Sequence, residues 1–132
     1  MQGIDTNILV RFLIGDDDLQ TKTVYNIFKQ AEADKNELFI PLLVILELIW
    51  VLESVYEISR KDIINSISDL LLMPVLRFEQ QSTVQRFTRE AYGNTYDLSD
   101  LLIACSAGQQ GCDTVITFDK KASRCDLFHL AQ

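Results

Sequence analysis

The stretch LFIPLLVILELIWVLESVY, residues 38–56, decides how this chain folds. Its first three residues, Leu38-Phe39-Ile40, form a short apolar run that predicts a buried strand. Pro41 suits the first position of a helix, and the apolar residues after it predict a helix that continues to about Tyr56. A strand followed directly by a helix, without a hairpin turn, is typical of parallel sheets that helices cover.

The rest of the chain repeats this alternation of short apolar runs and amphipathic stretches. Further strands are predicted to start at Ile4 and to cover residues 75–78, 114–118 and 127–130. Further helices are predicted over residues 16–34, 59–73, 82–92 and from 97 to 108 or 111. Because no hairpin signal joins the strands, we predict a three-layer α/β/α fold with a central, mainly parallel sheet.

Length and composition indicate one ordinary globular domain over residues 1–132, with 48% apolar and 23% charged residues. The apolar run from Ile40 to Leu52 is too short to cross a bilayer, and the first residues do not resemble a secretory signal. Three cysteines without a pairing pattern fit a reducing cytoplasm. The net charge of −7 argues against a protein that coats nucleic acid non-specifically, but it allows an enzyme that handles phosphates through bound cations.

Four carboxylates stand where polar residues are unexpected. Asp5 and Asp119 end predicted strands, and Glu47 and Asp100 lie on apolar helices that must pack on the sheet. Ligands of parallel sheets bind at the carboxyl ends of the strands, so we expect these side chains to converge there. Converging carboxylates repel one another unless cations join them, and oxygen ligands without His or Cys suit Mg²⁺ or Mn²⁺. The chemistry that such a site serves is phosphodiester hydrolysis.

Each of these acids also has a simpler interpretation. Asp5 and Asp119 can cap the structure that follows them. Asp97 can be the N-cap of a helix with Asp100 as its acidic partner three residues later. Glu47 can be a surface glutamate at the edge of an apolar face. The metal site is therefore predicted from the four acids jointly.

The same residues resemble a PIN domain, specifically the VapC-type toxins of bacterial toxin–antitoxin pairs. Four features in the family's order carry the resemblance: GIDTNILVR at residues 3–11, Glu47, DLSDLLIA at residues 97–104 and TVITFD at residues 114–119. The resemblance implies a Mg²⁺- or Mn²⁺-dependent endoribonuclease that cuts single-stranded RNA or tRNA loops in the cytoplasm. It also implies a homodimer that binds a cognate antitoxin.

Carried over position by position, the resemblance assigns roles to three groups of residues. The metal-binding acids would be Asp5, Glu47, Asp100 and Asp119, with Asp97 as an auxiliary acid. Polar residues beside them, expected to orient ligands or water, are Thr6, Asn7 and Thr117. A basic rim that could hold RNA would consist of Arg11, Lys120, Lys121 and Arg124.

Other functions fit this sequence less well. A non-catalytic PIN-like adaptor that binds RNA or protein should lack one of the four acids, and none is missing. A receiver-type phosphoacceptor needs an aspartate after its third strand, and a haloacid-dehalogenase-like phosphatase needs a second aspartate where Asn7 stands. The only histidine, His129, is expected at a sheet edge rather than in catalysis. The apolar helix after Pro41, which carries Trp50, exceeds the needs of one core and motivates the predicted homodimer.

Overall fold

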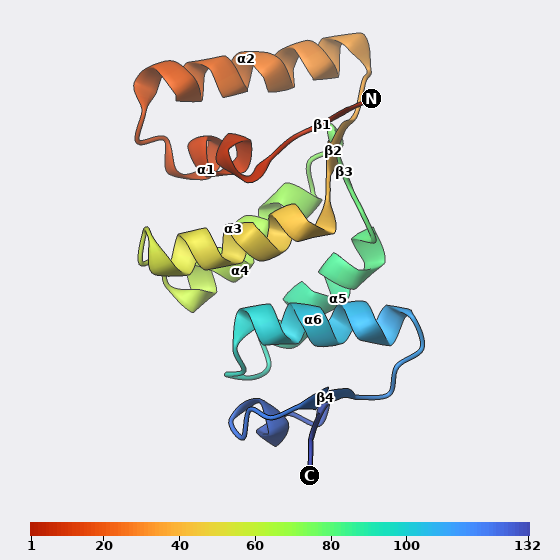
Figure 1. The fold of residues 1–132 in the computed structure, drawn as a ribbon. Coiled ribbons are helices and arrows are strands. Elements are labelled where there is room, and N and C mark those ends of the chain that lie inside the picture. Colours follow the sequence, from red (N-terminus) through yellow and green to blue (C-terminus); the bar gives the residue numbers. More distant parts are fainter. The chain divides into compact units, whose positions relative to one another are not determined.

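Pairs of helices follow the first three strands, and a 3₁₀ helix separates the last two strands, in the computed structural model, which describes residues 1–132 (Figure 1). The chain divides into a first unit, Met1–Gln81, and a second unit, Ser82–Gln132. The expected single domain over residues 1–132 stays a prediction. None of the helices combines the length and apolar character needed to span a bilayer.

The first unit holds a three-stranded parallel sheet of β1 (Gln2–Gly3), β2 (Leu38–Ile40) and β3 (Leu76–Phe78), in the order β1-β2-β3. Its helices are α1 (Thr6–Ile14), α2 (Asp18–Asp34), α3 (Leu42–Ser54) and α4 (Arg60–Leu71). The second unit contains α5 (Gln81–Ala91), which starts at the boundary, then α6 (Leu98–Gln109), β4 (Val115–Thr117), the short 3₁₀ helix η1 (Ala122–Arg124) and β5 (Phe128–Leu130). Strands β4 and β5 pair in parallel. The predicted α/β class with parallel strands is confirmed.

Side-chain caps set the beginnings of α2, α4 and α6. Asp17, Ser59 and Asp97 each accept a hydrogen bond from a backbone N–H in the first turn of the helix that follows. Gly15 ends α1 in the left-handed conformation, with φ of 66°, which glycine adopts without a steric penalty. The polypeptide can therefore turn from α1 into α2 within a few residues.

Most predicted boundaries are shifted by one or two residues, and two of these shifts lie close to predicted site residues or to the start of α3. The first strand covers Gln2–Gly3 and so lies before the predicted start at Ile4, although the backbone N–H of Ile4 still donates to the carbonyl of Phe39 at 2.9 Å. Pro41 is the N-cap of α3 rather than its first residue, because its extended backbone still belongs to the end of β2. The backbone N–H of Leu42 donates instead to a glutamate oxygen from another strand end, Oε1 of Glu79, at 2.7 Å.

Helix α3 supplies much of the core of the first unit through one face. The fully buried side chains of this face are Ile45, Leu48, Ile49 and Leu52. The opposite face stays in solvent, where Leu43 is 77% exposed and Trp50 is 58% exposed. Trp50, expected in the core or at a dimer interface, lies outside the core of this chain, because the other face of the helix fills that core.

Candidate active site

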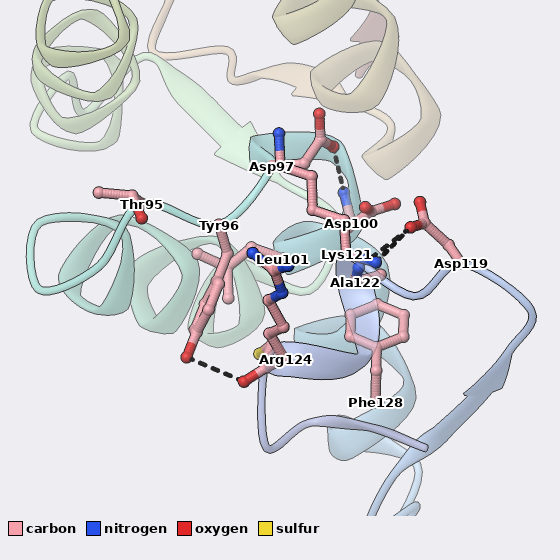
Figure 2. Close-up of a pocket in the computed structure, with 11 residues that line it drawn as sticks. Thr95, Tyr96, Asp97, Asp100, Leu101, Asp119, Lys121, Ala122, Arg124 and Phe128 are labelled. Carbon is pink, nitrogen blue, oxygen red and sulfur yellow. Dashed lines mark hydrogen bonds between the residues drawn. The ribbon is translucent and has the colours of Figure 1, made fainter. Parts of the chain in front are cut away.

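Three of the predicted acids gather around one pocket of the second unit. Asp97 and Asp100 stand at the start of α6, and Asp119 follows β4 (Figure 2). The pocket encloses about 210 Å³. Its other lining residues are Thr95, Tyr96, Leu101, Lys121, Ala122, Arg124, Cys125 and Phe128. In Figure 2 Asp97, Asp100 and Asp119 lie in the upper part of the site, Tyr96 lies to the left, and Phe128 lies below Lys121 and Ala122.

Backbone hydrogen bonds hold two of these carboxylates through one oxygen each. Oδ1 of Asp97 accepts from the backbone N–H of Asp100 at 2.9 Å. Oδ1 of Asp119 accepts from the backbone N–H groups of Lys121, at 2.8 Å, and Ala122, at 3.1 Å. The backbone N–H of Asp119 donates to Oγ1 of Thr117 at 3.0 Å. These bonds use Oδ1 of each carboxylate, so Oδ2 can accept from, or coordinate, a ligand.

The third carboxylate, Asp100, lies in an unfavourable electrostatic environment. Its pKa is raised above the ordinary value of 3.8, first by desolvation and then by the negative charges of Asp97 and Asp119. Asp100 is partly buried, and the negative charges of Asp97 and Asp119 lie close enough to repel its own charge. Ionising all three acids together therefore costs free energy. A bound cation would remove this cost.

The donor chemistry of the pocket fits a hard divalent cation. Carboxylate oxygens without histidine or thiolate ligands suit Mg²⁺ or Mn²⁺, and Mg²⁺ is commonly held by one or two carboxylates with waters filling the other positions. No three His, Cys, Asp or Glu side chains are drawn together tightly enough to form a complete cage. The acids present thus fit an ion that keeps part of its water shell and binds substrate phosphate as well.

The other two predicted acids belong to the first unit. Asp5 caps α1, and its Oδ1 accepts from the backbone N–H of Ile8 at 3.3 Å. Glu47 is exposed on α3, on the face that carries Leu43 and Trp50. The expectation that Glu47 is desolvated on a buried apolar face is wrong, because this face of α3 is open to solvent. That Asp5 and Glu47 converge with the acids of the pocket stays a prediction.

The three polar residues expected to orient ligands or water lie in different environments. Thr117 holds the backbone of Asp119 as described above, and Asn7 lies exposed beside Asp5 in a hollow of the first unit. Thr6 is only 4% exposed, and its Oγ1 has no hydrogen-bond partner. A buried hydroxyl without a hydrogen-bond partner lowers the stability of the folded state, because its desolvation is not compensated. Thr6 is therefore a destabilising position in the first unit.

The predicted basic residues also divide between the units. Lys121 and Arg124 line the pocket, Lys120 is exposed beside them, and none of the three forms an ion pair. Arg11, in the first unit, is bound to its neighbours. It pairs with Asp16 at 2.8 Å and donates to Gln20 and to the hydroxyl of Tyr56. The structure therefore gives Arg11 a packing role, whereas the other three cations are available to a ligand.

Sequence reasoning missed two aromatic residues of the pocket, Tyr96 and Phe128. It also missed Glu79, which caps α3 from the end of β3. The position of Tyr96 directly before the acidic segment that starts at Asp97 was a usable signal. Nothing local marks Phe128, because its place in the pocket depends on the pairing of β4 with β5.

Comparison with known proteins defines the class to which this fold and site belong. The model of the PIN domain family matches residues 4–127, and the chain belongs to this family, as its sequence motifs indicate. The predicted PIN-like α/β/α fold class is thereby confirmed. The chain is similar to a protein named VapC ribonuclease from Aquifex aeolicus (strain VF5). The two are 25% identical over 121 residues, which cover 92% of this chain and 89% of that protein.

Proposed function

We propose that this chain is a Mg²⁺- or Mn²⁺-dependent endoribonuclease that hydrolyses phosphodiester bonds in single-stranded RNA or tRNA loops. We further propose that it acts as the toxin of a type II toxin–antitoxin system. The observation that carries the proposal is the gathering of Asp97, Asp100 and Asp119 around one pocket whose rim bears Lys121 and Arg124. Membership of the PIN domain family and similarity to a VapC ribonuclease support it.

In this proposal the carboxylates of the pocket hold the cation. Asp97, Asp100 and Asp119 are its ligands in the second unit, and Asp5 and Glu47 are the further acids expected to join them. When bound, Mg²⁺ or Mn²⁺ lowers the pKa of a water and stabilises the oxygen that leaves the phosphorus. The protein itself holds Asp119 in place through Thr117 and the first N–H groups of the segment that leads into η1.

The cations beside the pocket have a different role in this proposal. Lys121 and Arg124, with Lys120 next to them, attract the RNA backbone toward carboxylates that would otherwise repel it. Arg11 was expected to belong to this rim, but its ion pair with Asp16 gives no support to that role. The overall negative charge remains compatible with a nuclease because the contact with phosphates is local.

The test is cleavage of total bacterial RNA, including tRNA, by the purified chain with Mg²⁺, with Mn²⁺ or with EDTA. Wild-type protein should produce discrete bands with either metal and none with EDTA. Asp100→Asn should produce none, whereas Asp113→Asn, which changes an exposed acid of the same unit outside the pocket, should cut like wild type. RNA binding without cleavage under every condition would support the non-catalytic adaptor instead.

We also propose a homodimer and a protein antitoxin as partners. The dimer proposal rests on two exposed apolar side chains of α3, Leu43 and Trp50, which lie on the same face of the helix as Glu47. Sedimentation velocity should show a dimer of wild type and a smaller species for the Leu43→Ser/Trp50→Ser double variant. Leu72→Ser, at an 80% exposed position outside α3, is the matched control and should leave the dimer intact.

The proposed location is the cytoplasm. All three cysteines, Cys105, Cys112 and Cys125, are free thiols in the structure. Free thiols fit a reducing compartment, where disulfides are rare. Fractionation of cells that produce the chain, with immunodetection in each fraction, tests this location directly.

A further inference from the structure

The pocket that holds the three acids is also lined by an apolar wall, which metal binding does not use. This apolar wall consists of Tyr96, which is half-buried, and of Leu101 and Phe128, which are buried. Tyr96 and partly buried neighbours pack against a small core of Ala104, Cys125 and Phe128, which gives this wall a firm base. One cavity therefore presents both carboxylates and the aromatic side chain of Tyr96.

The tyrosine is held in place from both its backbone and its side chain. Its backbone N–H donates to Oδ1 of Asn94 at 3.1 Å, and Nδ2 of Asn94 donates to the carbonyl of Glu90 at 2.9 Å. Its hydroxyl donates to the carbonyl of Arg124 at 3.5 Å. These contacts fasten the ring of Tyr96 between the end of α5 and η1. A side chain that is already ordered loses little conformational entropy when a ligand stacks on it.

The size of the cavity limits what can enter. At about 210 Å³ it is smaller than the roughly 300–1,000 Å³ typical of sites for drug-sized molecules. One flat heterocycle fits this description better than a larger ligand. Lys121 and Arg124, on the same rim, would meet the phosphates on either side of such a group.

We propose that this pocket binds one unpaired nucleobase of the RNA against Tyr96, next to the phosphodiester bond that is cut. The inference rests on the proposed ribonuclease function and deepens it by naming how the substrate is held. Proteins read single-stranded RNA by splaying bases out of the stack and placing them on aromatic side chains. Tyr96 is accordingly a residue that positions the substrate, and it determines a preference for unpaired nucleotides.

The experiment measures binding rather than cleavage, so that it stands apart from the test of the nuclease itself. Fluorescence anisotropy with labelled short single-stranded RNA of mixed sequence, in EDTA, is compared with an abasic strand of the same length. Tyr96→Leu removes the aromatic ring. Tyr96→Phe keeps the ring but removes the hydroxyl that bonds the Arg124 carbonyl, and Arg124→Gln removes a cation without changing the wall.

We expect Tyr96→Leu to weaken binding of the base-bearing RNA by about tenfold, the usual order for one lost base–aromatic stack. The same variant should bind the abasic strand like wild type, and Tyr96→Phe should match wild type on both strands. Arg124→Gln should weaken both strands alike. Far-UV circular dichroism and thermal unfolding of each variant check that the fold is retained.

Three results would overturn the inference. The first is unchanged binding of base-bearing RNA by Tyr96→Leu. The second is an equal loss by this variant on both strands, which would make the residue a general support of the surface. The third is an equal loss for Tyr96→Phe and Tyr96→Leu, which would assign the effect to the hydroxyl and not to the ring. Metal-dependent cleavage with any of these results would leave the proposed function standing without the base pocket.

Discussion

Asp97 binds the backbone N–H of Asp100 through one carboxylate oxygen, Oδ1, at 2.9 Å. Asp97 thus caps α6 and also lines the pocket, together with Asp100. An N-cap and the residue three positions later lie in one turn of helix, so capping brings a second carboxylate to the pocket with the first. The start of α6 therefore serves both the stability of the helix and the assembly of the candidate site.

The two roles of Asp97 can be separated by substitution. Asp97→Ala removes both the cap and the carboxylate and should lower the free energy of unfolding by about 1 kcal/mol. Asp97→Ser retains a capping oxygen and should unfold like wild type while losing a share of the metal-dependent activity. Urea denaturation and RNA cleavage measure the two effects. Equal loss of stability in both variants would contradict the capping role.

The pH dependence of stability should carry the signature of Asp100. Its pKa is raised in the folded state, so the folded protein binds this proton more tightly than the unfolded chain does. The stabilising contribution is full below the ordinary value of 3.8 and is lost as the pH rises through the higher pKa of the folded state. In EDTA, wild type should lose stability relative to Asp100→Asn as the pH rises through this window.

Denaturation midpoints of both proteins over a pH series give the measurement. Mg²⁺ should reverse the loss at neutral pH in wild type only, because a ligand that binds the folded state stabilises it, by roughly 2.7 kcal/mol at a hundred times its dissociation constant. Parallel pH profiles for wild type and variant, with no effect of Mg²⁺ on either, would contradict the crowding of acids around Asp100.

Removal of the unpaired hydroxyl of Thr6 should stabilise the first unit. Because Oγ1 of Thr6 is buried without a partner, Thr6→Val exchanges a desolvated polar atom for a methyl group of similar size. We expect a gain of about 1 kcal/mol in the free energy of unfolding. Thr88→Val is the matched control, since buried Thr88 donates to the carbonyl of Gln85 at 2.9 Å, and this change should destabilise. A loss of stability in Thr6→Val would indicate a bonding partner for the hydroxyl.

The three thiols should differ in reactivity. Cys112 is exposed, whereas Cys105 and Cys125 are buried. Burial, together with the charge of Glu90, raises the pKa of the Cys105 thiol to about 11, so this thiol stays protonated at neutral pH. One equivalent of a disulfide reagent such as Ellman's should therefore react quickly with native protein, and Cys112→Ser should abolish that phase. A fast phase of more than one thiol would contradict the burial of the other two.

Much of the candidate site was readable from the sequence because its acids sit in recognisable local contexts. Asp97 and Asp100 stand at a helix start and Asp119 follows a strand, as their sequence contexts predict, and the structure gathers these three around one pocket. Glu47 was chosen for its apolar neighbours along α3, but those neighbours face solvent. A helical pattern shows which residues share a face, and it does not show whether anything covers that face.

The sequence by itself determined the order and type of most elements, with α1 and η1 as the exceptions. Strand residues 38–40 and the caps Asp17, Ser59 and Asp97 follow from hydrogen bonds and spacing within a few residues, which local chemistry controls. Only the tertiary structure decided the rest. The hydroxyl of Tyr56 meets Arg11 45 residues earlier, and that of Tyr96 meets Arg124 28 residues later. Such contacts depend on how helices and strands pack, and no local pattern encodes which distant side chain fills the space beside them.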